Sequence, residues 1–262
     1  MVSRDVLITG GSDGIGLAVA RLLAAEKGTR VMLVARDAAK LRDAVATLPG
    51  DAHDVIAADL SVPNDVQTVA SHLESTHYDV LINNAGFGLY GRFSDLALED
   101  QLRMMRLNMD SVVRLSHAYL RQARRGDALV NTASFLAYAP MPGAAAYSAT
   151  KAFVATLSET LWWEYRNKGV YVLAFNPSVS TTRFHAAAGG SAAVYPRALV
   201  QPPETVAREM VAALRSRTTP RVITGFPTRM LVRLQRVVSS KMAVNMMGRN
   251  SPLSDGSATK TE

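Results

Sequence analysis

Cysteine is absent from the 262-residue chain, and aromatic residues make up only 6% of it. The lack of cysteine excludes a disulfide scaffold, a thiolate metal site and a cysteine nucleophile. No uninterrupted apolar run approaches the roughly 18 residues of a membrane-spanning helix. A strand pattern begins at residue 6 and leads directly into a glycine turn, which leaves no room for a signal peptide. We therefore expect a soluble, cytoplasmic protein without a bound metal ion.

Acidic residues are scarce toward the C-terminus. The formal net charge is +7, and seven of the 29 Lys and Arg residues follow residue 220, against two of the 22 Asp and Glu residues. The basic character is therefore largely a property of the C-terminal end. A DNA-binding protein would concentrate such charge on a recognition element, and no motif of this kind occurs. We expect no nucleic-acid partner.

Short β-branched runs alternate with amphipathic or alanine-rich stretches along most of the chain, and 48% of the residues are apolar. The expected strands are residues 5–9, 30–35, 55–58, 80–83, 128–132, 171–175 and 222–224. The expected helices are residues 15–25, 38–48, 64–74, 98–120, 145–165 and 203–215. Strands spaced by helices predict right-handed βαβ units. The fold class is therefore α/β, with one doubly wound parallel sheet of about seven strands.

The pattern changes after residue 225. Residues 1–225 form the predicted α/β domain, residues 226–248 a basic amphipathic extension of it, and residues 249–262 a polar tail that we expect to be disordered. A helix is expected over residues 230–238. The extension has three interpretations: it covers a cleft, contacts another subunit or lies on an anionic membrane surface. The first two are favoured over the third.

A glycine-rich turn joins the first strand to the first helix. Its residues expected to meet a cofactor are Gly10, Ser12, Asp13, Gly14, Ile15 and Gly16. Glycines allow a tight turn, a close approach of the backbone to a pyrophosphate and close packing of the helix on the sheet. The helix N-terminus then presents its N–H groups to the phosphates. This placement predicts dinucleotide binding.

The end of the second strand indicates which dinucleotide binds. An acidic residue there selects NAD, whereas an arginine accommodates the 2′-phosphate of NADP. Arg36 follows the strand directly, and Asp37 is interpreted as the cap of the next helix, although it could be the NAD-selective carboxylate shifted by one position. NADP(H) is therefore favoured over NAD(H). Asp59 and Leu60, after the third strand, are expected to meet the adenine.

Tyr147 and Lys151 are four residues apart on a predicted helix and so share one face. A phenol has a pKa near ~10 and needs a neighbouring cation to act as an acid–base catalyst. Ser134 follows the fifth strand, at the sheet edge where α/β proteins bind ligands. Its hydroxyl could donate a hydrogen bond to a reacting carbonyl oxygen. A surface Tyr/Lys pair without function is the alternative.

Together these motifs resemble the single-domain branch of the short-chain dehydrogenase/reductase family, over roughly residues 4–225. The glycine turn matches the family's cofactor turn, and Asn84, Ala85 and Gly86 match the motif after its fourth strand. The turn, Arg36 and the C-terminal extension look like the ketoacyl-reductase-like branch. One departure is Ser178, because the family usually has glycine after the proline at this place.

The resemblance implies a Rossmann fold and an active enzyme. It implies a catalytic set of Asn108, Ser134, Tyr147 and Lys151, in which Tyr147 protonates the alkoxide formed by hydride transfer and Ser134 orients it. Lys151 would bind the nicotinamide ribose and lower the Tyr147 pKa, and Asn108 would hold a relay water. Further cofactor contacts implied by the family are Pro177, Val179 and Thr182, with Tyr147 and Lys151.

The substrate is expected to be a hydrophobic ketone or ketoacyl compound, because the residues expected around the pocket are largely apolar. Ser134, Leu136, Tyr147 and Phe184 are the predicted substrate contacts, and residues 184–195 are expected to form a mobile loop that closes on the substrate. His185 is interpreted as solvated. The alternatives are an oxidative NAD(P)-dependent alcohol or hydroxysteroid dehydrogenase and a non-catalytic NADP(H)-sensing protein. The family also implies a homodimer or homotetramer.

Overall fold

The structure, a computed structural model, describes residues 4–189, 195–249, 251 and 253. Seven strands form one parallel sheet in the order β3-β2-β1-β4-β5-β6-β9. Their bounds are β1 (Arg4–Thr9), β2 (Thr29–Ala35), β3 (Asp54–Ala57), β4 (Val80–Asn83), β5 (Ala128–Thr132), β6 (Tyr171–Asn176) and β9 (Arg221–Ile223). The predicted α/β class and the doubly wound Rossmann topology are confirmed.

Helices cover both faces of the sheet. Their bounds are α1 (Gly14–Ala24), α2 (Ala38–Ala46), α3 (Pro63–Ser75), α4 (Leu98–Met105), α5 (Ser111–Gln122), α6 (Ala145–Tyr165) and α8 (Pro203–Ser216). Alternation along β1 divides the core: Val6 and Ile8 pack in the cluster that contains α1 and α8, whereas Leu7 packs in the cluster that contains α3 and α5. Both faces of each central strand are therefore apolar, as a covered parallel sheet requires.

The long helix expected over residues 98–120 is interrupted. A π-helical turn, Arg106–Asp110, separates α4 from α5. Such turns are rare and often mark functional sites. The apolar periodicity runs through the insertion, which is why the sequence predicts one continuous helix.

A second, two-stranded sheet was not predicted. It pairs β7 (Val179–Ser180) with β8 (Val200–Gln201) beyond the end of β6. Short strands of this length carry no periodicity that a sequence pattern could reveal. The pair brings Gln201 beside the segment that follows β6.

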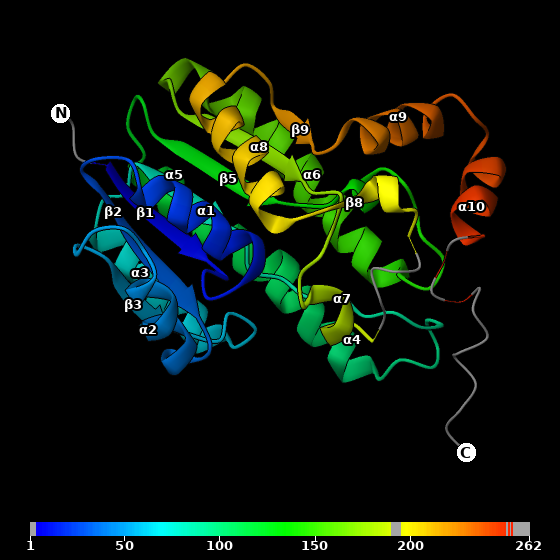
Figure 1. Ribbon diagram of the computed structural model, residues 1–262, viewed down its shortest axis with the longest axis horizontal. Coiled ribbons are helices and arrows are strands. Elements are labelled where there is room, and N and C mark those ends of the chain that lie inside the picture. Colours follow the sequence, from blue (N-terminus) through cyan, green and yellow to red (C-terminus); the bar gives the residue numbers. More distant parts are fainter. Residues whose placement is uncertain (1–3, 190–194, 250, 252, 254–262) are drawn as a thin grey trace.

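The C-terminal extension forms α9 (Phe226–Gln235) and α10 (Ser240–Gly248), which lie at the opposite end of the molecule from β2 and β3 (Figure 1). Val232 and Met247 pack in the same apolar cluster as Leu136 and Tyr147, so the extension supports the wall of the predicted substrate pocket. This placement agrees with the cleft-covering interpretation. The predicted tail, residues 249–262, lies largely outside the described residues.

Exposed apolar side chains follow the other side of α9, at Phe226, Met230, Leu234 and just beyond it at Val237. Among the described residues, no helix is long and apolar enough to cross a bilayer.

Candidate active site

A cavity of about 400 Å³ opens at the carboxyl ends of the central strands. It lies where the strand order reverses between β1 and β4, the place at which open α/β sheets bind ligands. Most residues predicted to meet cofactor or substrate line it: Gly10, Ser12, Asp13, Gly14, Ile15, Arg36, Leu60, Asn84, Ala85, Gly86, Ser134, Leu136, Tyr147, Lys151, Pro177, Val179, Thr182 and Phe184. Gly16, Asp59 and Asn108 are not part of this lining.

The glycine turn is packed so closely that side chains are excluded. A Cβ on Gly16 would lie 2.3 Å from the Gly10 carbonyl oxygen, and one on Gly10, whose φ is +66°, would lie 2.9 Å from Ala85 Cα. The Asn84 side-chain amide donates to the carbonyl oxygens of Thr9 (3.1 Å) and Gly10 (3.3 Å). The turn from β1 is thus joined to the end of β4.

The N-terminus of α1 faces this cavity without a side-chain cap. Asp13 is the N-cap residue, but its carboxylate makes no capping hydrogen bond and instead accepts from Arg183 Nε at 2.6 Å. The first amide groups of α1 are therefore left for a ligand. Uncapped amides beside glycines that leave backbone exposed fit the pyrophosphate of a dinucleotide.

Asp37 caps α2, as predicted. Its Oδ1 accepts hydrogen bonds from the backbone amides of Ala39 (3.0 Å) and Lys40 (3.1 Å), and these bonds lower the pKa of the carboxyl. Arg36 is exposed and lines the cavity, and so does Lys40 one helical turn later. Lys40 was not predicted from the sequence, in which Arg36 precedes the helix and so has no helical spacing to Lys40.

Asp59 is placed differently from the expectation. Its carboxylate accepts hydrogen bonds from the amide (2.9 Å) and the hydroxyl (2.6 Å) of Ser61, so it is engaged within its own loop. Its neighbours Ala58 and Leu60 line the cavity. The local Asx-type geometry of Asp followed two residues later by Ser explains this orientation.

Tyr147 and Lys151 lie on α6, and both side chains are buried. Lys151 Nζ lies 5.8 Å from the centroid of the Tyr147 ring and donates to the Thr132 carbonyl oxygen at 2.8 Å. Burial raises the pKa of Tyr147, and a hydrogen bond with the Ser134 hydroxyl partly opposes that shift. Burial lowers the pKa of Lys151 to about 8. At neutral pH the phenol is therefore protonated and can donate a proton.

Asn108 lies in the π-helical turn and is fully buried. Its Nδ2 donates to the Phe87 carbonyl oxygen (2.9 Å) and to Thr150 Oγ1 (3.1 Å), and its Oδ1 accepts from the Phe87 amide (3.2 Å). A Cβ on Gly86 would lie 3.0 Å from Asn108 Oδ1 and 3.3 Å from Lys151 Nζ. Two members of the predicted set, Asn108 and Lys151, therefore meet at Gly86.

The segment after β6 closes over the glycine turn. A Cβ on Gly14 would lie 3.1 Å from Thr182 Cγ2, and the Arg183–Asp13 ion pair joins the same two segments. No local pattern could predict this pair, because its members are 170 positions apart. Contacts of this kind depend on the tertiary fold alone.

The substrate end of the cavity is mainly apolar but has one polar corner. Phe184 lies 5.5 Å from Tyr147 between ring centroids. His185, expected to be solvated, is buried, and its Nδ1 lies 3.2 Å from Tyr90 Oη. Tyr195 also lines the cavity, and its buried hydroxyl lies beside that of Tyr90. In the loop expected over residues 184–195, Phe184–Ala187 form a short helix, α7, and residues 190–194 lie outside the described residues.

The family model for short chain dehydrogenases matches residues 4–190. The chain belongs to the short-chain dehydrogenase family. Asn84, Tyr147 and Lys151 all fall within the matched part of this short-chain dehydrogenase.

Named relatives agree with this assignment. The 17-beta-hydroxysteroid dehydrogenase type 3 of Mus musculus is 33% identical over 184 residues, which are 67% of this chain and 60% of the relative. The chain thus spans about three fifths of that relative's length.

Solved structures are similar over more of the chain. A short-chain dehydrogenase from Sphingobium yanoikuyae in complex with NADPH is 32% identical, with a TM-score of 0.78 over 84% of this chain and 87% of that one. A bulky-bulky ketone specific alcohol dehydrogenase from Comamonas testosteroni is 27% identical, with a TM-score of 0.74 over 90% of this chain and 95% of that one. The fold around the cavity is therefore that of nicotinamide-dependent oxidoreductases.

Proposed function

We propose that this short-chain dehydrogenase is an NADPH-dependent oxidoreductase that reduces a hydrophobic ketone or ketoacyl compound. The observation that carries the proposal is the convergence of Ser134, Tyr147 and Lys151 on a cavity whose other end is the uncapped glycine turn. One end fits a pyrophosphate and the other offers a proton donor. A non-catalytic NADP(H)-binding protein would need only the first of these.

The bound cofactor would supply a hydride from its nicotinamide ring to the carbonyl carbon. Tyr147 donates its phenolic proton to the carbonyl oxygen as negative charge develops there, and Ser134 donates a hydrogen bond to the same oxygen. Lys151, when charged, favours the phenolate left on Tyr147. Asn108 fixes the backbone at Phe87 and so holds the wall at Gly86 against Lys151.

Arg36 and Lys40 support a preference for NADP(H). Both line the cavity at the end of β2, where the adenosine ribose of a dinucleotide lies. Two cations fit a 2′-phosphate, and the capping hydrogen bonds of Asp37 engage a carboxylate that would otherwise compete for the ribose hydroxyls. NAD(H) is the less favoured cofactor.

The lining supports a bulky, mainly apolar substrate. Leu136 and Phe184 belong to a buried cluster beside Tyr147, and the Comamonas testosteroni relative is named for bulky ketones. An oxidative alcohol or hydroxysteroid dehydrogenase would use the same residues, as the name of the mouse relative illustrates.

NADPH consumption by the purified protein tests the proposal with a panel of bulky cyclic ketones, ketoacyl thioesters and sugars. We expect turnover of the apolar ketones or the thioesters, and faster reduction with NADPH than oxidation of the matching alcohols with NADP. Turnover of sugars alone, or of no carbonyl compound, would contradict it.

Two expectations from the sequence stay predictions. We propose a homodimer or homotetramer that uses α4, α5 and α6, on which Leu98, Val113 and Trp163 are exposed. The cytoplasmic location is proposed from the sequence alone.

A further inference from the structure

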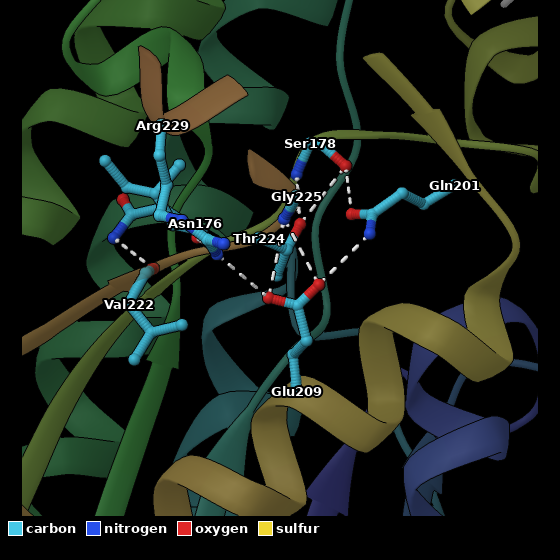
Figure 2. Close-up of polar contacts among 9 residues, drawn as sticks. Asn176, Ser178, Gln201, Glu209, Val222, Thr224, Gly225 and Arg229 are labelled. Carbon is cyan, nitrogen blue, oxygen red and sulfur yellow. Dashed lines mark hydrogen bonds and ion pairs between the residues drawn. The ribbon is translucent and has the colours of Figure 1, made fainter. Parts of the chain in front are cut away.

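A continuous set of polar contacts lies beside the cavity at the carboxyl end of β6 (Figure 2). We call it the Glu209 network; its members are Ser178, Gln201, Glu209, Thr224, Gly225 and Arg229. They come from the β6–β7 connection, β8, α8, the connection from β9 to α9, and α9 itself. The network is independent of Ser134, Tyr147 and Lys151.

Ser178 is the member that reaches the cavity, between the lining residues Pro177 and Val179. Its hydroxyl donates to Gln201 Oε1 at 2.5 Å and accepts from Thr224 Oγ1 at 3.1 Å. Its backbone amide donates to the same Thr224 oxygen at 2.8 Å. Both the backbone and the side chain of Ser178 are therefore held from outside the cavity.

Glu209, on α8, is where the network ends. Its Oε1 accepts from Gln201 Nε2 at 3.0 Å and from the Gly225 amide at 3.1 Å, and its Oε2 accepts from Arg229 Nη1 at 3.4 Å. A carboxylate only accepts hydrogen bonds, so it fixes the direction of every bond that leads to it. The Gln201 amide must present its nitrogen to Glu209 and its oxygen to Ser178.

The same carboxylate holds the beginning of the C-terminal extension. Gly225 is the N-cap residue of α9, and Arg229 also donates to the Ile223 carbonyl oxygen at 3.2 Å. A Cβ on Gly225 would lie 3.3 Å from Gln201 Oε1, so β8 and the beginning of α9 are in close contact beside Glu209 of α8. Figure 2 shows them converging on the Glu209 carboxylate.

We propose that Glu209, acting through Gln201 and Ser178, is a positioning residue for the cavity wall that contacts the nicotinamide half of the cofactor. The proposal rests on the proposed cofactor function. It gives Ser178 a role at a position where the family usually has glycine. A glycine has no hydroxyl to join the network, and its backbone has greater conformational freedom. The hydroxyl replaces that freedom with hydrogen bonds, which hold Pro177 and Val179 in place before the cofactor binds.

The test compares two ligands in fluorescence or calorimetric titrations. NADPH carries the nicotinamide half, whereas 2′-phospho-ADP-ribose has the same adenine, 2′-phosphate and pyrophosphate without the nicotinamide. Gln201→Leu removes both the acceptor for Ser178 and the donor to Glu209, while the bonds of Glu209 to Gly225 and Arg229 remain. We expect the Kd for NADPH to rise about five- to tenfold, the effect of one or two lost hydrogen bonds, and the Kd for 2′-phospho-ADP-ribose to stay within about twofold.

Four further variants separate positioning from general stability. Ser178→Ala should reproduce the selective loss of affinity for NADPH, and Glu209→Ala should cause a larger loss. Glu209→Gln should cause a smaller loss than Glu209→Ala, because an amide oxygen can still accept from Gln201. Glu204→Ala, which removes an exposed carboxylate from the same helix, should change neither Kd.

A parallel loss of affinity for both ligands, or an unchanged Kd for NADPH in Gln201→Leu and Ser178→Ala, would overturn the inference. A wild-type protein that binds 2′-phospho-ADP-ribose and NADPH equally well would also overturn it. A wild-type protein that binds neither would instead overturn the proposed function.

Discussion

Arg36 and Asp37 are adjacent, yet the structure gives them separate tasks. Both residues line the cavity, but Asp37 also caps the N-terminus of α2. The sequence left both cofactor interpretations open because either residue could lie near the ribose. The hydrogen bonds that Asp37 accepts from the amides of Ala39 and Lys40 favour the NADP(H) interpretation, which stays a proposal.

Arg36→Ala should weaken NADPH binding selectively. A charge-assisted contact to phosphate contributes about 1.5–3 kcal/mol, so the Kd for NADPH should rise by about tenfold or more, with Lys40 retaining part of the affinity. Titration with NADPH and with NADH measures the two affinities. Arg42→Ala is the control, because Arg42 lies nearby on α2 and is exposed outside the cavity lining. Equal loss for NADH and NADPH would contradict the assignment and favour Asp37.

Lys151 makes the stability of the cofactor-free protein depend on pH. Burial lowers its pKa to about 8 in the folded state, below the ordinary value of 10.5. Between these values the unfolded state binds more protons, so the free energy of unfolding rises with pH. We expect a rise of about 2 kcal/mol from pH 7.5 to 9.5 in urea denaturation. Lys151→Met should abolish the rise, and Lys168→Met, at an exposed position, should preserve it. A flat profile in the wild-type protein would contradict the burial argument.

The elements that the sequence predicts well are those with a complete local signal. The strand Val80–Asn83 and the helix Ala145–Tyr165 have the expected bounds, because apolar runs and alanine-rich periodicity identify them without tertiary context. The π-helical turn at Arg106–Asp110 and the β7–β8 pair were missed. The first lies within an uninterrupted helical pattern, and the second depends on contacts between residues about twenty positions apart.

The candidate site follows the same division. Motif residues such as Tyr147 and Lys151 could be named from spacing, since four positions on a helix place side chains on one face. The orientation of Asp59, the burial of His185 and the Glu209 network could not be, because each is decided by hydrogen bonds that only the folded chain forms.

The structure leaves no space for a side chain on Gly16, near the start of α1. In Gly16→Ala the new Cβ would meet the Gly10 carbonyl oxygen at 2.3 Å, which forces the turn away from α1. We expect the free energy of unfolding to fall by about 1–3 kcal/mol and NADPH binding to weaken in parallel. Gly248→Ala is the control, because its Cβ would lie 3.6 Å from Pro142 Cγ, an ordinary contact. Unchanged urea midpoints in Gly16→Ala would show that the turn is less tightly packed than the structure indicates.

At the scale of the whole molecule, the cavity is assembled from most of the chain. Its proposed cofactor end comes from the segments after β1, β2 and β4, its proposed catalytic residues from the segment after β5 and from α6, and its remaining wall from the segment after β6. The C-terminal helices pack behind the substrate side and are joined to the rest by Glu209 and Arg229. We therefore expect single substitutions to affect cofactor binding and catalysis separately, although both proposed sites belong to one cavity.

The central claim is that this cavity catalyses carbonyl reduction with Tyr147 as the proton donor. The most direct measurement compares wild type and Tyr147→Phe for both NADPH affinity and the turnover of a bulky ketone. We predict a Kd for NADPH within about twofold of wild type and a kcat lower by about 10²–10⁴-fold, because the substitution removes only the phenolic hydroxyl that donates the proton. Tyr165→Phe, the same change elsewhere on α6, should leave both values unaltered. Wild-type turnover in Tyr147→Phe would contradict the account.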